Sequence, residues 1–365
     1  MLLGLQTQYV INGSSHFFFF TRQNKHLFST DNNMASLKDV ARLASVSLMT
    51  VSRAINNPEL LKPETLRQVQ HAIDVLNYVP DLSARKIRGK NTNLSCMGVL
   101  AIDTASAPFS VEILLAIEQC AEKYGWDHFV VNISSGDDPV AAVRQILSRR
   151  PDGIIITSAE LREINIPELL RDRNLVLTNC YDPGNTALPS YIPDDYHAQY
   201  DATEYLIQRG YRRPLCIWPP AECLSSGLRR DAVQNAWLNA GLSAGQLNQH
   251  NITLSDIYYR DVVTLIDQYI DGNSPLFDCI ICGNAQIAFV VYQVLLTRGI
   301  SVPEQAGILG CENMTGTGEL FYPPLTTIRS PYRLLGETAA LHLIEERVSS
   351  GRTYVPCRML SRESL

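Results

Sequence analysis

The sequence predicts a two-part chain, in which a small all-helical head precedes a doubly wound α/β body built from two similar halves. Three observations carry this prediction. Residues 37–78 contain three short helical patterns separated by tight turns. From residue 95 onward, short apolar runs alternate with amphipathic helical patterns. A basic segment, residues 81–90, joins the two parts.

The first two helical patterns of the head have clear start signals. Ser36 and Ser47 each precede a helical pattern, where a serine hydroxyl can accept a hydrogen bond from a free backbone N–H. Ser45 lies in the turn between them, where a positive φ would strain any residue with a side chain. Apolar residues at helical spacing supply the inner faces: Leu37, Val40, Ala41, Ala44, Val51, Ala54 and Ile55.

Two short helices joined by a tight turn can place the second helix in a DNA major groove. Arg53 on its outward face can make a bidentate contact with guanine, and Leu48 and Met49 can touch thymine methyl groups. Small polar side chains on or after this helix suit phosphate oxygens: Thr50, Ser52, Asn56 and Asn57. A plain helical bundle would not need outward polar residues together with a basic segment.

The third helix is expected to begin at Pro63 and to end at Asn77-Tyr78, before Val79-Pro80. Asp81 can then cap a short helix that carries Arg85, Lys86 and Arg88. Residues 34–90 hold nine Lys and Arg against five Asp and Glu, whereas the whole chain has a net charge of -6. A basic head on an acidic body is what a phosphate-binding domain attached to a sensor should show.

Three strings of the head, LKDVARLA, VSLMTVSRAINN and LNYVPDLSARKI, resemble the LacI/GalR family of bacterial sugar-responsive repressors. In that family a hinge helix follows NYVP, and two hinge helices of a dimer enter the minor groove. The resemblance therefore implies DNA contacts from Ser83, Arg85, Lys86 and Ile87, with Ile87 as the apolar wedge where leucine is usual. Ser45 stands where the family commonly has glycine.

The short apolar runs of the body predict parallel strands covered by helices on both faces. The expected strands are 96–102, 127–133, 153–157, 175–179, 214–218, 250–252, 278–282, 306–310 and 327–328. The expected helices are 111–124, 139–149, 195–209, 228–240, 261–269, 286–298 and 334–349. Residues 95–360 resemble the two-lobed, periplasmic-binding-protein-like (type I) sensor of the same family, most specifically in YPPLTTIRSPYRLLGETAALHLIE.

The expected domain organisation follows from these patterns. Residues 1–33 are expected to be a disordered extension, or a mis-assigned start with translation beginning at Met34. The DNA-binding domain is expected at 34–80, the hinge helix and linker at 81–94, and the sugar sensor at 95–365. Within the sensor, we expect an N-lobe of 95–191 plus 332–356 and a C-lobe of 192–331.

The family resemblance also implies an effector cleft between the lobes, where amides, carboxylates and an arginine meet sugar hydroxyls. The residues that it assigns there are Phe109, Asn179, Arg229, Asn284, Glu312 and Tyr332, with Trp218 and Tyr258 as weaker candidates. The four aromatic residues fit an ordinary core equally well. Three positions depart from the usual family pattern and put the identity of the sugar in doubt: Ala232, Ala285 and Cys311-Glu312.

The sequence lacks the motifs of several other functions. There is no Walker A motif, no GxGxxG after a strand, and no nucleophile set in a recognisable context, so we expect neither an enzyme nor a cofactor. Cys279 and Cys282 lie in an apolar run without a second pair, which favours core packing over a metal site. The run Phe17–Phe20 is too short to span a bilayer.

We therefore expect a homodimeric repressor in the bacterial cytoplasm, associated with the nucleoid, that binds double-stranded operator DNA and leaves it when a sugar binds. Strings such as PFSVEILLAIEQ and LPSYIPDDY look most like repressors of sucrose and raffinose utilisation operons, so sucrose, raffinose or a hexose product is the expected effector. The alternative is a solute-binding sugar receptor of the same clamshell fold, which would need an export signal and no head.

Overall fold

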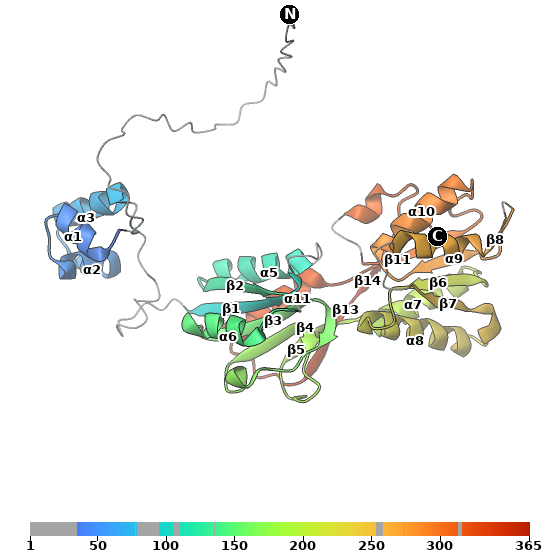
Figure 1. Ribbon diagram of the computed structural model, residues 1–365, viewed down its shortest axis with the longest axis horizontal. Helices are drawn as coiled ribbons and strands as arrows, with labels where there is room; N and C mark the ends of the chain where they lie inside the picture. Colours follow the sequence, from blue (N-terminus) through green and yellow to red (C-terminus); the bar gives the residue numbers. More distant parts are fainter. Residues whose placement is uncertain are drawn as a thin grey trace, which may run out of the picture. The chain divides into compact units, whose positions relative to one another are not determined.

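The computed structural model divides the chain into two compact units, residues Met1–Lys90 and Asn91–Leu365 (Figure 1). The described residues are 35–76, 78, 95–104, 110–134, 136–252, 258–272, 274–312 and 316–365. Ser83, Arg85, Lys86, Ile87 and Phe109 lie outside them, as do the side chains of Asn56 and Tyr258.

The head consists of three α-helices and one 3₁₀ turn: α1 (Leu37–Leu43), α2 (Leu48–Asn56), η1 (Pro58–Leu60) and α3 (Pro63–Leu76). Both predicted serine caps are confirmed. The Ser36 hydroxyl accepts from the backbone N–H of Asp39, and the Ser47 hydroxyl accepts from that of Thr50 at 3.1 Å. Ser45 has φ 52°, so the turn adopts the left-handed conformation that strains a residue with a side chain. Helix α3 ends at Leu76, just before its expected end.

The head has a small core of its own. Val40, Val51 and Val69, one from each α-helix, are fully buried, and they pack with partly buried neighbours such as Ile73 and Leu76. Because the three helices close on these few aliphatic side chains, the opposite face of α2 remains at the surface.

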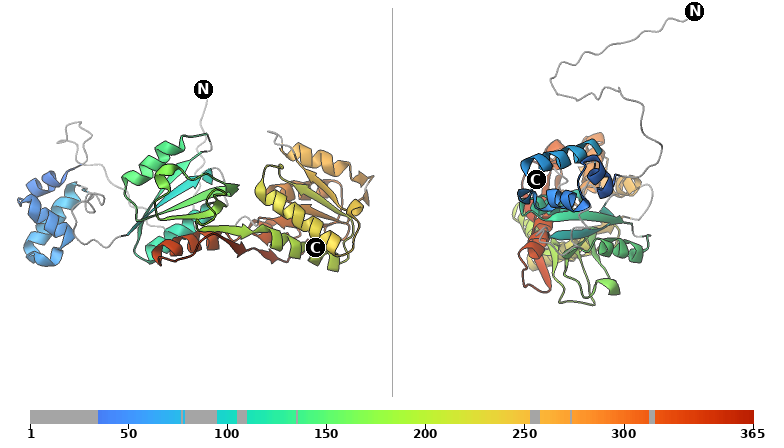
Figure 2. Two further views of the ribbon diagram at one scale, coloured as in Figure 1. Left: turned by 90° about the horizontal axis from the view of Figure 1, so that it is seen from below. Right: turned by 90° about the vertical axis from the view of Figure 1, so that its left-hand side faces the viewer.

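The second unit contains two six-stranded sheets, and we call each sheet with its covering helices a lobe (Figures 1 and 2). The N-lobe sheet has the order β13-β5-β4-β3-β1-β2 and is entirely parallel. Its strands are β1 (Cys96–Ile102), β2 (Asp127–Ile133), β3 (Gly153–Glu163), β4 (Leu175–Tyr181), β5 (Ser190–Asp194) and β13 (Arg352–Pro356). Its helices are α5 (Ser110–Lys123), α6 (Pro139–Ser148), η3 (Glu168–Leu170) and α11 (Tyr332–Ile344).

The C-lobe sheet has the order β14-β12-β11-β10-β6-β7, with only β14 antiparallel to its neighbour. Its strands are β6 (Pro214–Trp218), β7 (Asn248–Asn251), β10 (Cys279–Cys282), β11 (Gly307–Cys311), β12 (Thr326–Arg329) and β14 (Arg358–Leu360). The helices and short hairpin around it are α7 (Asp195–Gln208), α8 (Leu224–Asn239), η4 (Ala244–Gln246), α9 (Tyr258–Asp267), α10 (Ala285–Thr297), η5 (Thr317–Leu320), β8 (Ile270–Asp271) and β9 (Ser274–Pro275).

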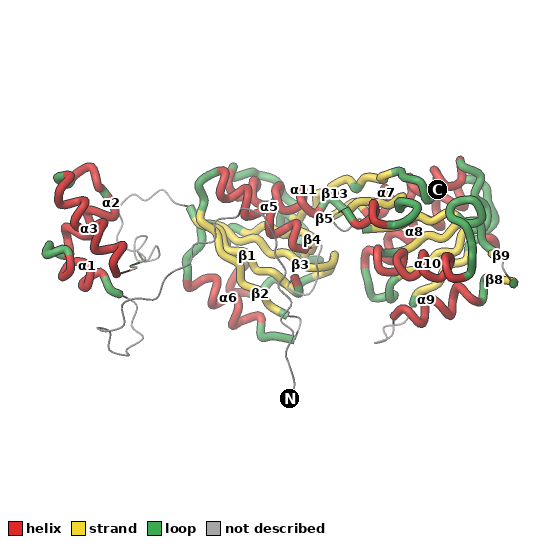
Figure 3. The backbone as a smooth tube through the Cα atoms, turned by 90° about the horizontal axis from the view of Figure 1, so that it is seen from above, coloured by secondary structure: helices red, strands yellow, loops and turns green. Residues whose placement is uncertain are grey.

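Each sheet is covered on both faces, as the continuous apolar runs predicted. In the N-lobe, α5 and α11 pack on one face and α6 on the other (Figure 3). In the C-lobe, α9 and α10 pack on one face and α7 and α8 on the other. None of the described helices is both long and apolar enough to cross a membrane.

Three segments cross between the lobes, and in two of them the sequence patterns did not predict the strands. The chain passes from β5 into α7, from β12 into α11, and from β13 into β14. Strands β5, β13 and β14 were not predicted, because they are short and carry polar or proline residues where an apolar run was sought. Helix α8 begins at Leu224 and α11 at Tyr332, both earlier than expected, and α11 ends earlier, at Ile344.

Helices α5 and α11 approach each other so closely that Gly336 has no room for a side chain. A Cβ at Gly336 would lie 2.3 Å from the Ile113 carbonyl oxygen and 3.0 Å from the Ala116 Cβ. We predict that Gly336→Ala lowers the free energy of unfolding by about 1–3 kcal/mol, because the two helices must move apart. Urea unfolding followed by circular dichroism measures this change.

Gly227→Ala in α8 is the matched control, because a Cβ there meets nothing within 4 Å. It should leave stability unchanged or raise it by about 0.5–1 kcal/mol, since alanine favours a helix interior. Equal stability of the Gly336→Ala and wild-type proteins would show that the α5–α11 contact is looser than the structure has it.

Candidate functional site

The outward face of α2 carries side chains that reach solvent. Met49 is 65% exposed and Leu48 43% exposed, and Arg53 is exposed one turn later. Thr50, Ser52 and Asn57 are partly buried. The Thr50 hydroxyl lies 2.9 Å from the Ser47 hydroxyl, so it belongs to the cap as well as to the surface. Among the described residues predicted to touch DNA, Leu48, Met49 and Arg53 are therefore the most accessible.

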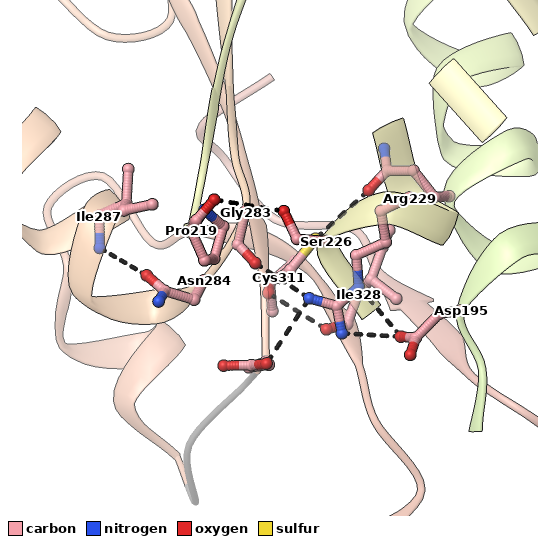
Figure 4. A network of polar contacts seen from close by, with 12 residues as sticks. Asp195, Pro219, Ser226, Arg229, Gly283, Asn284, Ile287, Cys311 and Ile328 are labelled. Atoms are coloured by element: carbon pink, nitrogen blue, oxygen red, sulfur yellow. Dashed lines mark hydrogen bonds and ion pairs between the residues drawn. The ribbon is translucent and has the colours of Figure 1, made fainter. Parts of the chain in front are cut away.

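In the C-lobe a buried arginine connects two helices to the ends of two strands. Arg229 on α8 donates from Nε and Nη2 to Asp195 Oδ1, at 3.0 and 2.7 Å, where Asp195 is the first residue of α7 (Figure 4). Its Nη1 donates to the carbonyl oxygen of Gly283, directly after β10, at 2.9 Å. The same Nη1 lies 3.5 Å from a carboxylate oxygen of Glu312, directly after β11.

Burial makes these charges interdependent. The side chains of Asp195 and Arg229 are 0% and 4% exposed, whereas that of Glu312 is 20% exposed. Burial alone would lower the pKa of Arg229, but the Asp195 and Glu312 carboxylates hold that pKa well above its usual value. Burial raises the pKa of Glu312, with Arg229 opposing that shift and Asp195 adding to it. Arg229 is therefore a fixed cation that orients the carboxylate of Glu312.

Both predicted amide residues are engaged by the fold itself. Asn284 caps α10, with its Oδ1 accepting from the backbone N–H of Ile287 at 2.9 Å (Figure 4). Asn179 is buried at the end of β4, with φ +55°, and its Nδ2 donates to the carbonyl oxygens of Ser158 and Ala159. Each amide therefore has one end committed to backbone atoms.

Two of the four predicted aromatic residues, Tyr332 and Trp218, have described side chains, and they differ in their surroundings. Tyr332 begins α11, just after the crossover from β12, and is partly buried; burial and the nearby charge of Glu312 raise its pKa. Tyr332 thus lies near Asp195, Arg229 and Glu312, which we call the charged cluster, although it belongs to the other lobe. Trp218 is fully buried, packs within the C-lobe core, and donates from Nε1 to Gln249 Oε1 at 3.0 Å. Trp218 is therefore a core residue rather than a cleft wall.

Sequence reasoning missed Asp195, the partner that fixes Arg229. The string PDDY places two acidic residues at the start of a helix, which is the signal that could have found it. Asp195 Oδ2 is buried and has no hydrogen-bond partner among the residues that the structure describes.

One cavity lies elsewhere in the sensor. It has a volume of about 490 Å³ and is lined by residues at the amino ends of β3 and β4, among them Gly153 and Asn174. None of the predicted effector residues lines it. Of the residues that the sequence singled out, Arg229 and Glu312 come together in the charged cluster, with Tyr332 nearby.

The buried pair of Asp195 and Arg229 should be essential to the stability of the C-lobe. We predict that Asp195→Asn lowers the free energy of unfolding by about 3–5 kcal/mol, because it leaves a buried arginine without its full partner. Asp267→Asn is the control, since it removes the similar but surface-exposed pair with Arg298 and should cost about 0–1 kcal/mol. Urea unfolding at neutral pH compares the two variants, and equal losses would contradict the special role of the buried pair.

Comparisons with known proteins cover both units. Residues 36–81 match the model of bacterial regulatory proteins of the lacI family. Residues 96–363 match the model of periplasmic binding proteins and the sugar binding domain of the LacI family. The chain is 50% identical over 331 residues to the sucrose operon repressors of Shigella flexneri and Escherichia coli, which covers 90% of this chain and 99% of theirs.

A solved structure, the Lac repressor dimer bound to operator and the anti-inducer ONPF, has the same fold. It superposes with a TM-score of 0.73 at 23% identity, over 91% of this chain and 99% of that one. The predicted fold class, a helix-turn-helix head with a two-lobed α/β sensor, is thereby confirmed. From the two family models and the identity across nine-tenths of its length, the chain belongs to the LacI family of bacterial regulatory proteins.

Proposed function

We propose that the chain is a homodimeric transcriptional repressor of a sucrose- or raffinose-type utilisation operon, released from its operator by a sugar. The observation that carries this proposal is the 50% identity to sucrose operon repressors, which spans the head and the sensor alike. The names of these relatives and of the Lac repressor are those of repressors, not of enzymes. The cytoplasm, at the nucleoid, is where such a repressor would act.

In this proposal α2 is the recognition helix. Arg53 would read guanine, and Leu48 and Met49 would meet thymine methyl groups, because these three are the exposed side chains among the described candidates. Thr50, Ser52, Asn56 and Asn57 would position the helix on phosphates. The hinge residues Ser83, Arg85, Lys86 and Ile87 would enter the minor groove of the same site.

A repressor of this kind needs two copies, because a two-fold protein matches a pseudo-palindromic operator. The C-lobe carries apolar side chains that a single copy leaves in water. Phe289 on α10 is 55% exposed, and Leu320 and Tyr322 on or after η5 are 83% and 95% exposed. Phe321 lies between them and packs on Phe289 and Tyr292. We propose that the second copy covers this surface.

The effector would bind near the charged cluster, between the ends of the strands that carry Asn179, Asn284 and Glu312. Arg229 has most of its N–H groups committed to Asp195 and Gly283, so Glu312 is the more available partner for sugar hydroxyls. Tyr332 would contribute an apolar wall. A transport receptor of the same clamshell is the competing function, but it would make no use of the exposed face of α2.

Gel-shift titration on the DNA upstream of the chain's own gene tests the proposal. We expect Arg53→Ala to weaken operator binding about tenfold or more, because one bidentate guanine contact is lost, while sugar binding stays unchanged. Arg67→Ala on α3, whose Nε donates to the carbonyl of Pro63, is the control and should bind as the wild type does. Failure of the wild-type protein to shift any upstream fragment at low salt would contradict the repressor function.

A further inference from the structure

Strand β3 carries a bulge opposite Asn179 of the neighbouring strand β4. Thr157 pairs with Thr178 and Arg162 pairs with Cys180, so residues 158–161 of β3 face the single residue Asn179 of β4. The Asn179 amide donates to two carbonyl oxygens of this bulge, at 3.0 and 3.3 Å. A buried side chain thus replaces the strand pairing that the bulge has lost.

The bulge presents one acidic side chain to solvent. Ala159 and Leu161 are 4% and 5% exposed and anchor the bulge, whereas Glu160 between them is exposed. The ion pair of Arg162 with Asp103, at 2.8 Å, holds the chain directly after it. Glu160 itself has no hydrogen bond or ion pair within the part of the chain that the structure describes.

Glu160 lies on a strand that the other lobe contacts. Helix α8 of the C-lobe contacts β3, the N-lobe strand that carries Glu160. The negative charge of Glu160 helps to raise the pKa of two C-lobe groups, the Cys223 thiol at the start of α8 and the Glu312 carboxyl, although burial is the main cause in both. Two carboxylates from opposite lobes are therefore close enough to repel each other when both are ionised.

We propose that Glu160 is the N-lobe acceptor for hydroxyl groups of the effector, acting opposite Glu312, and that the pair selects uncharged sugars over phosphorylated ones. This inference rests on the proposed function. Sugar hydroxyls can donate to both carboxylates at once, so a neutral sugar offsets their repulsion and draws the lobes together. A phosphate group would meet two negative charges, and Arg229 is already engaged by Asp195 and Gly283.

Calorimetric titration tests this assignment with sucrose, raffinose, melibiose, fructose and glucose, and with the 6-phosphates of sucrose, fructose and glucose. The wild-type protein should bind at least one parent sugar, and no phosphate should bind more tightly than its parent. Glu160→Gln should weaken the tightest sugar about tenfold, because a charge-assisted hydrogen bond is lost. Glu163→Gln is the matched control, since Glu163 accepts from the Tyr181 hydroxyl instead, and should bind as the wild type does.

The outcomes separate the two proposals. Wild-type protein that binds none of the sugars overturns the proposed function and this inference with it. Wild-type binding that Glu160→Gln leaves unchanged, or a phosphate that binds more tightly than its parent, overturns the inference alone.

A second measurement needs no ligand. Glu160→Gln should speed alkylation of Cys223 by iodoacetamide about twofold, because a lower thiol pKa yields more thiolate. Peptide mass spectrometry follows the rate at this thiol, with Glu163→Gln again as the control. An unchanged rate would show that Glu160 does not face the C-lobe, and would also overturn the inference.

Discussion

The buried ion pair between Arg229 and Asp195 is the interaction on which the sensor's charged cluster depends. A guanidinium taken out of water is costly, so it must be matched by acceptors on every side. Here α7 supplies a carboxylate, β10 supplies a carbonyl oxygen through Gly283, and β11 supplies Glu312. One side chain thereby connects two helices to two strand ends, and it lies 3.5 Å from the Glu312 carboxylate that the proposed effector would meet.

Most of the architecture could be predicted from the sequence, because the signals for those elements are local. Ser36 and Ser47 cap the helices of the head, and apolar runs mark the central strands of both lobes. Strands β5, β13 and β14 were not predicted because pairing with distant strands, not their own composition, makes them strands. The bulge at Glu160 was not predicted for the same reason, since it exists only where β3 and β4 shift in register.

The candidate site was predicted less completely than the fold. Arg229 and Glu312 do meet, but the family pattern gave no hint that Asp195 takes two of the arginine's hydrogen bonds. Asn179 and Asn284 were assigned to the ligand, yet each also supports backbone that no sequence pattern reveals. Residue type can suggest a polar group at a strand end, but only the surrounding contacts show how much of its bonding capacity remains.

A sugar-released repressor requires that the effector and the operator oppose each other through one protein, and such coupling must be reciprocal. Calorimetric titration of the tightest sugar into free protein and into operator-bound protein measures it directly. The operator should weaken sugar binding by the factor, about 5- to 150-fold, by which the sugar weakens operator binding. The same sugar affinity in both titrations would contradict it.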